Sequence, residues 1–160
     1  MINFTKMQGI GNDYVYVNCF KETVNNPEEF SKFVSDRHFG IGSDGLILIM
    51  PSEIADFRMR MFNADGSEGN MCGNGTRCIG KYVYDYHLTD KTNITLETRV
   101  GIKYLTLTIT DGNVSYVEVD MGKAILNPKE IPVISELDRI ISEPIIVDDK
   151  EYFITCVSMG

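Results

Sequence analysis

The residues with the clearest chemical potential form a glycine-rich loop around one cysteine. Cys72 stands in the stretch Met71-Cys72-Gly73-Asn74-Gly75, directly before a segment whose apolar spacing predicts a helix. Backbone N–H groups at a helix start stabilise a thiolate and bind anions, and glycine lets a ligand approach the backbone closely. The loop therefore predicts a reactive thiol beside a binding site for a carboxylate-sized anion.

A cysteine in a reduced protein more often packs as a small hydrophobic residue than acts as a nucleophile. The glycines beside Cys72 favour the reactive interpretation. The remaining cysteines have no such neighbours, and we assign them to packing: Cys19, Cys78 and Cys156. Four cysteines in 160 residues are also too sparse for a secreted disulfide scaffold, so we expect them to be reduced.

Three asparagines stand in loops that also contain glycine: Asn12, Asn63 and Asn74. Asparagine beside glycine ordinarily stabilises turns and helix caps. Three such loops in one domain also fit contact with a ligand.

Composition restricts the classes of protein. With 43% hydrophobic and 24% charged residues, the chain is typical of an ordered globular domain, or of one half of a protein built from two similar halves. A net charge of −8 argues against non-specific nucleic-acid binding, which relies on basic surface. Neither a leader nor an apolar stretch of membrane-spanning length is evident, so we expect a cytoplasmic protein away from membranes.

The elements that must position these residues follow from hydrophobic periodicity. One helix is predicted to begin at Asn26-Pro27 and end near Asp36, and a second to run from about Thr76 to His87. Alternation and strand propensity predict strands at residues 2–7, 13–19, 46–50, 57–61, 94–98, 102–110, 114–121, 145–147 and 152–157.

Many strands with two helices predict the α+β class, with a curved sheet wrapped around a helix. Asp111-Gly112 is a hairpin signal between two of the strands, which favours antiparallel pairing there. No linker divides the chain, so we expect residues 1–160 to form one compact domain.

Several motif matches lack the context that their chemistry requires. Gly40–Gly45 fits the dinucleotide-binding glycine pattern, but a predicted helix precedes it and a strand follows, the reverse of the required order. Asn63–Glu68 lacks the glycine and glutamate positions of a calcium loop. Five residues separate Cys72 from Cys78, unlike the close pairs of zinc sites. A redox disulfide between these two cysteines stays open.

The chain resembles the diaminopimelate epimerases. The resemblance runs from residue 1 to residue 160 and covers the N-terminal half of the family's sequence. Four stretches carry it: Lys6–Tyr14, Asp36–Gly45, Phe62–Glu68 and Cys72–Cys78. It implies a curved, mostly antiparallel sheet around a central helix.

The resemblance also implies an activity, the interconversion of LL- and meso-diaminopimelate for lysine and cell-wall synthesis. The family uses no pyridoxal phosphate or metal. One cysteine removes the α-proton as a thiolate, and a second delivers a proton from the opposite face as a thiol. Cys72 would be one of the two, and its partner would come from a second domain of similar fold.

By the same resemblance, Asn12 and Asn63 would hold the distal amino-acid end of the substrate. The N–H groups of Gly73, Asn74 and Gly75 would bind the carboxylate and stabilise the charge that develops as the proton leaves. Many members carry glutamine where this sequence has Gly45, so a role for Gly45 as a substrate contact departs from the common pattern.

Cys-Gly-x-Gly occurs once in this sequence, which leads us to expect that residues 1–160 are inactive alone and need a C-terminal domain to complete the cleft. The last strands would belong to the crossover between the domains, and the family's homodimer stays open. Two alternatives also remain open. The chain would be a non-catalytic carboxylate-binding module, or part of a related racemase or isomerase for another amino acid.

Overall fold

The computed structural model describes residues 1–159, and Gly160, the end of the stretch that carries the resemblance, lies outside them. The chain divides into two compact units, and the first ends at Asp120. The first contains β1 (Thr5–Gly9), β2 (Asn12–Asn18), α1 (Pro27–Ser35), β3 (Gly45–Met50), β4 (Phe57–Asn63), β5 (Glu68–Gly69), α2 (Gly73–Asp85), β6 (Asn93–Thr98), β7 (Gly101–Thr110) and β8 (Asn113–Asp120). The second contains the short 3-10 helix Pro128–Glu130, β9 (Glu143–Val147) and β10 (Lys150–Ile154).

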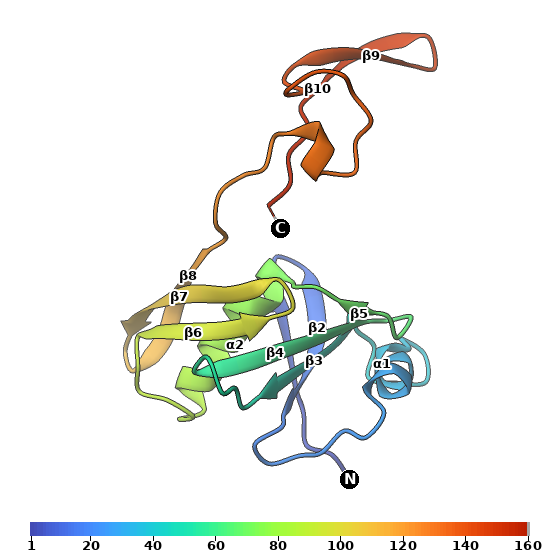
Figure 1. The fold of residues 1–160 in the computed structure, drawn as a ribbon. Coiled ribbons are helices and arrows are strands. Elements are labelled where there is room, and N and C mark those ends of the chain that lie inside the picture. The colour runs from blue at the N-terminus through green and yellow to red at the C-terminus, as the bar shows by residue number, and fades with distance from the viewer. Residues whose placement is uncertain (160) are drawn as a thin grey trace. The chain divides into compact units, whose positions relative to one another are not determined.

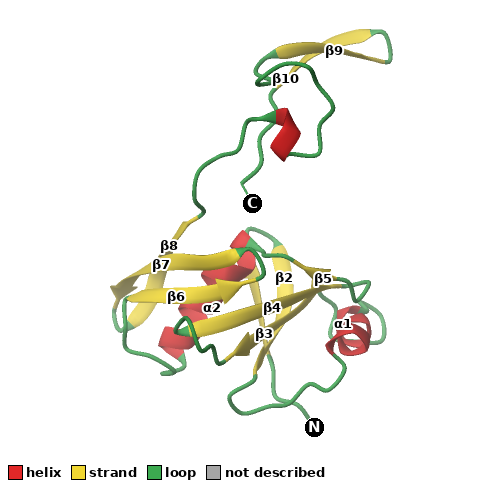
Figure 2. Cartoon of the chain, in the orientation of Figure 1, coloured by secondary structure: helices red, strands yellow, loops and turns green. Residues whose placement is uncertain are grey.

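The first unit is built on one eight-stranded sheet. Its strand order is β1-β2-β3-β4-β6-β7-β8, with β5 paired to β4. The pairs β2–β3 and β4–β6 are parallel, and the other pairs are antiparallel. Figures 1 and 2 show the sheet curling around α2, while α1 lies against its other face. The predicted α+β class, with a mostly antiparallel sheet around a central helix, is confirmed.

Strand periodicity explains why both faces of the sheet are buried near its middle. Successive side chains of a strand point to opposite faces. In β3, Ile47 and Ile49 face the α2 side, whereas Leu46 and Leu48 face the α1 side. All four are at most 2% exposed. The continuous apolar run predicted as a buried strand therefore fills two hydrophobic layers at once.

The second helix begins earlier than its sequence predicts. Its first residue is Gly73 and its N-cap is Cys72, three residues before the expected start at Thr76. Glycine and asparagine have low helix propensity, so the sequence pattern did not predict this first turn. The cap compensates, because the Cys72 sulfur accepts a hydrogen bond from the Gly75 N–H at 3.3 Å.

The expected loop at residues 8–12 is a tight turn of two residues. Ile10 and Gly11 both have positive φ, at 55° and 80°, as in the primed turns that join antiparallel strands. The first strand is displaced accordingly, to Thr5–Gly9 rather than residues 2–7. Asn12 is thus the first residue of β2 rather than part of the expected loop.

The second unit has little sheet of its own. β9 and β10 form an antiparallel hairpin, and Ile125 pairs with Ser158 in an isolated bridge. The last strand ends at Ile154, so Cys156 follows the strand in which we expected it. Ile146 and Phe153 are each 67% exposed, which leaves this hairpin with apolar side chains in solvent.

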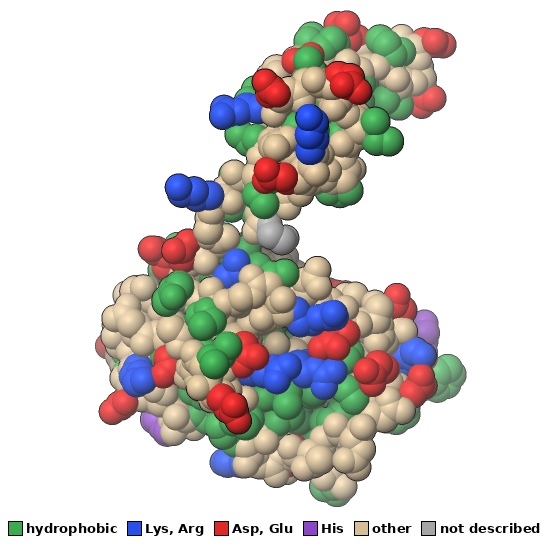
Figure 3. Space-filling model, in the orientation of Figure 1, with side chains coloured by type: hydrophobic (Ala, Val, Ile, Leu, Met, Phe, Trp, Pro, Cys, Tyr) green, Lys and Arg blue, Asp and Glu red, His purple; other side chains and the backbone are tan. Residues whose placement is uncertain are grey.

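The visible surface mixes charges of both signs. Figure 3 shows basic and acidic side chains interspersed over the outer face of the first unit's sheet. Two ion pairs account for part of this arrangement, Arg60–Glu68 at 2.8 Å and Arg58–Glu97 at 3.5 Å. None of the helices in residues 1–159 has the length and apolar composition that a membrane span requires.

Candidate active site

The ends of three strands gather the predicted site residues at one edge of the sheet. β2 and β3 run parallel, with Tyr14 opposite Gly45, and β3 and β4 run antiparallel, with Gly45 opposite Asn63. The starts of β2 and β3 and the end of β4 therefore lie together. The first turn of α2 joins them there, because Cys72 contacts Asn12 at the start of β2.

Cys72 is held at the junction between an extended segment and a helix. Its backbone is extended, with φ −132° and ψ 111°, and its carbonyl accepts the first helical hydrogen bond from Thr76 at 2.8 Å. Its sulfur accepts from the Gly75 N–H and donates its hydrogen to Asn12 Oδ1, each at 3.3 Å. The half-buried thiol thus has a donor on one side and an acceptor on the other.

The first turn of α2 supplies an anion site beside the thiol. Within residues 1–159, the N–H groups of Gly73 and Asn74 have no acceptor, as is usual at a helix start. The helix dipole adds partial positive charge at this end. The Gly75 N–H, which we expected to bind substrate, is instead used by the Cys72 sulfur. Two of the three predicted carboxylate donors are therefore available.

Gly75 has a second, structural reason to be glycine. A Cβ at this position would lie 2.5 Å from Ile47 Cδ1 and 3.2 Å from Met59 Cε. Real Cβ atoms essentially never come as close as the 2.5 Å to Ile47, so the first turn of α2 rests directly on the core of the sheet. This contact fixes where Cys72 stands relative to the strands.

Asn12 connects the thiol to a charged network that sequence reasoning missed. Its amide nitrogen donates to Asp44 Oδ2 at 2.7 Å. Arg37 then bridges two carboxylates, at 2.9 Å from Asp44 Oδ1 and 2.8 Å from Asp13 Oδ1. Asp44 stands within one of the recognised stretches, but its pairing across 32 residues leaves no local sequence signal.

Tyr14 lies beneath the same site. Its side chain is 4% exposed, and its hydroxyl faces the side chains of Asn12 and Cys72. Burial, followed by the effect of the neighbouring Cys72, raises the pKa of Tyr14 to about 12. The hydroxyl therefore keeps its proton at neutral pH.

The structure places Asn63 and Gly45 side by side but does not join them to the thiol. Asn63 Nδ2 donates to Ser67 Oγ at 2.9 Å, and within residues 1–159 no hydrogen bond links Asn63 to Cys72. A Cβ on Gly45 would lie 2.0 Å from the Phe62 carbonyl oxygen and 2.8 Å from Tyr14 Cε1. This position therefore accepts no side chain in the folded chain, and any contact there is through the backbone.

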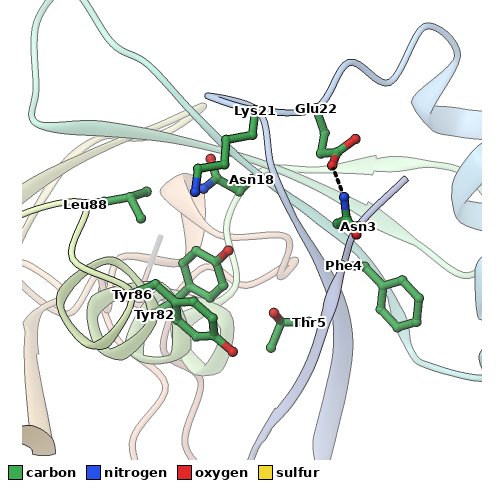
Figure 4. A pocket seen from close by; sticks show the side chains of 9 residues that line it. All are labelled: Asn3, Phe4, Thr5, Asn18, Lys21, Glu22, Tyr82, Tyr86 and Leu88. Carbon is green, nitrogen blue, oxygen red and sulfur yellow. Dashed lines mark hydrogen bonds between the residues drawn. The ribbon is translucent and has the colours of Figure 1, made fainter. Parts of the chain in front are cut away.

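A pocket lies at the opposite end of α2. Figure 4 shows this pocket of about 420 Å³, where the stacked rings of Tyr82 and Tyr86 lie beside residues from the start of β1 and the end of β2. None of the predicted site residues lines it, and it contains no cysteine. We therefore place the candidate active site at Cys72. Among residues 1–159, no group of three or more His, Cys, Asp or Glu side chains is arranged to hold a metal ion.

The charged network predicts a pH-dependent contribution to stability. The hydrogen bond from Arg37 is the largest influence that lowers the pKa of Asp13, from 3.8 to about 2. A carboxyl with a depressed folded-state pKa stabilises the fold above its unfolded pKa and loses that effect as the pH falls through the folded value. The contribution of Asp13 is thus complete above pH 3.8 and disappears towards pH 2.

We expect Asp13→Asn to lower the free energy of unfolding at pH 7 by about 1 kcal/mol, a value reduced for the half-exposed partner Arg37. The difference from the unsubstituted chain should shrink as the pH approaches 2, measured by urea denaturation across this range. Asp111→Asn, in an exposed hairpin turn, is the matched control. A difference that stays constant from pH 7 to pH 2 would contradict the assignment.

The chain is similar to known proteins over almost its whole length. The chain is 62% identical to the diaminopimelate epimerase of Acetivibrio thermocellus and 60% identical to that of Methanococcus maripaludis, in each case over 99% of this chain and 57% of the relative. The chain thus spans little more than half the length of these relatives.

Solved structures support the fold. A hydroxyproline epimerase from Agrobacterium vitis matches 96% of this chain and 48% of its own with a TM-score of 0.66 at 13% identity. A methylitaconate-delta-isomerase matches 71% of this chain and 36% of its own with a TM-score of 0.58 at 16% identity. Residues 4–127 match the family model described as diaminopimelate epimerase. With this match and the curated relatives, the chain belongs to the diaminopimelate epimerase family.

Proposed function

We propose that this chain supplies one half of the active site of a diaminopimelate epimerase, with Cys72 as one of two proton-transferring cysteines. One observation carries the proposal: the Cys72 sulfur caps the helix whose Gly73 and Asn74 N–H groups have no acceptor within residues 1–159. A substrate carboxylate bound to these donors would bring its α-carbon next to the thiol.

This arrangement suits removal of an α-proton. As the Cα–H bond breaks, negative charge spreads from the α-carbon into the adjacent carboxylate. Donors already aimed at that carboxylate stabilise the charge without reorganising during the reaction. A positioned base contributes roughly a hundred- to ten-thousandfold, so the donors at Gly73 and Asn74 must supply a further part of the acceleration.

Inversion needs a second acid–base group on the opposite face. In the proposed reaction, one thiolate takes the α-proton and becomes a thiol, while the second thiol gives its proton to the other face and becomes a thiolate. No electron is gained or lost, so proton transfer between two cysteines completes the chemistry. We propose that the second cysteine comes from a C-terminal domain, because this chain spans 57% of its epimerase relatives.

We further propose that Asn12 and Asn63 hold the distal amino-acid end of diaminopimelate. Asn12 uses one amide hydrogen on Asp44 and one oxygen lone pair on Cys72, and the Tyr14 hydroxyl also faces its amide, which leaves one of its four hydrogen-bonding positions for a ligand. Asn63 donates to Ser67 and keeps its amide oxygen free within the described residues. Such contacts would distinguish diaminopimelate from simpler amino acids.

The proposal predicts that deuterium from heavy water enters the α-carbon of diaminopimelate only when a C-terminal epimerase domain is joined to this chain. The measurement is mass spectrometry of the substrate after incubation with the joined protein or with residues 1–160 alone. Affinity for diaminopimelate without exchange in the joined protein would favour a binding module. Exchange into proline but not diaminopimelate would favour a racemase of another amino acid.

A further inference from the structure

A chain of hydrogen bonds leads from a surface arginine to the candidate catalytic thiol. Arg37 Nη2 donates to Asp44 Oδ1 at 2.9 Å, and Asp44 Oδ2 accepts from Asn12 Nδ2 at 2.7 Å. The Asn12 amide oxygen then accepts the Cys72 S–H at 3.3 Å. Asp44 does not contact the thiol directly. It contacts Asn12, and Asn12 contacts Cys72.

The Asn12 amide has two orientations of nearly equal shape and opposite chemistry. One presents the oxygen to Cys72, and the other presents the NH2 group. An ionised carboxylate is an acceptor only, so Asp44 admits the NH2 group and rejects the oxygen. The Asp13 backbone N–H also donates to Asp44 Oδ2, at 3.0 Å, which together with Arg37 fixes the carboxylate in place.

We infer that Asp44 is a positioning residue that sets the orientation of the Asn12 amide and thereby presents an acceptor, rather than a donor, to the Cys72 sulfur. The relevance of this role to catalysis rests on the proposed function, in which Cys72 transfers a proton. This role is distinct from substrate contact, because Asp44 acts on the thiol through Asn12.

The orientation decides which form of the thiol is favoured. An acceptor oxygen holds the S–H hydrogen, whereas an NH2 group would donate to the sulfur and stabilise the thiolate. The Gly75 N–H donates to the sulfur in both orientations of the Asn12 amide, so its effect on the sulfur does not differ between them. Asp44 therefore keeps an acceptor, and not a second donor, against the Cys72 sulfur.

The test is the rate at which iodoacetamide alkylates Cys72 in residues 1–160, resolved from the other cysteines by peptide mass spectrometry. We expect Asp44→Asn to raise this rate roughly threefold to tenfold, the range that corresponds to one hydrogen bond. Asp44→Glu keeps the charge beside Arg37 but displaces the carboxylate by one methylene. We expect the same direction of change, and this variant covers the case in which Asp44→Asn fails to fold.

A double-mutant cycle separates orientation from simple charge. With Asn12→Ala the amide is gone, so Asp44→Asn should change the alkylation rate by less than about a factor of two. An equal acceleration in both backgrounds would overturn the inference, because Asp44 would then act on Cys72 through its charge alone. An unchanged rate for both Asp44→Asn and Asp44→Glu in the otherwise unsubstituted chain would also overturn it.

Asp111→Asn makes the same chemical change in an exposed turn of the β7–β8 hairpin and should leave the rate unchanged. The readout requires neither substrate nor a second domain. A failure of deuterium exchange in the joined protein would count against the proposed function, whereas the alkylation cycle decides the role of Asp44 separately.

Discussion

Cys72→Ala in the joined two-domain protein is expected to lower the rate of diaminopimelate epimerisation by about a hundred- to ten-thousandfold, the contribution typical of a positioned acid–base group. Alanine removes the sulfur and leaves the Gly73 and Asn74 N–H groups in place. Substrate affinity should therefore fall much less than turnover. The measurement is kcat and KM by circular dichroism of the interconverting stereoisomers.

Cys19→Ala is the matched control for this substitution. Cys19 is also a half-buried free cysteine, but it follows β2 at the end remote from Asn12, and its thiol faces the Val17 carbonyl. Its removal should leave turnover within a factor of about two. Full activity of Cys72→Ala would refute the proposed role, and equal losses in both variants would point to general damage.

Gly45→Ala is expected to lower the free energy of unfolding by about 3 kcal/mol or more, because overpacking against rigid backbone is among the costliest substitutions. The new Cβ would overlap the Phe62 carbonyl, at 2.0 Å, in the neighbouring strand β4. Relief requires β3 and β4 to separate where Gly45 pairs with Asn63. Urea denaturation of residues 1–160 measures the loss.

Gly112→Ala provides the comparison for Gly45→Ala. Gly112 has a positive φ of 77° and no atom within 4 Å of a Cβ, so alanine there meets backbone strain without overlap. We expect a loss of about 1 kcal/mol. If Gly45→Ala were no more damaging than this, the start of β3 would have room to open, and a side chain at this position would be able to reach substrate.

Sequence patterns predicted those parts of the fold that rest on local chemistry. The Asn26-Pro27 start of α1 was predictable because its cap is local, and the structure shows the Asn26 side chain accepting from the Glu29 N–H. The buried strand β3 was equally predictable, because its residues are continuously apolar. The short strand β5 was not, because two residues form it only by pairing with Met61 and Phe62 of β4.

In the candidate site, too, the features set by neighbouring residues could be predicted, and those set by distant residues could not. Cys72 was singled out from the sequence because its glycines are sequence neighbours, and Asn12 because it lies within a recognised stretch, and their roles in the site stay predictions. Asp44 and Arg37 were missed as partners of Asn12 and Asp13, since folding brings them together across 24 to 32 residues. The use of the Gly75 N–H by Cys72 was also missed, because it depends on where the helix begins.

The close packing of Gly75 against Ile47 and Met59 has a consequence for engineering this protein. Because no side chain separates the first turn of α2 from the sheet, a change in the volume of Ile47 would move the turn as a unit, together with the sulfur and its neighbouring N–H groups. Substitutions chosen only to improve the hydrophobic interior at this point would therefore also retune the reactivity of the thiol.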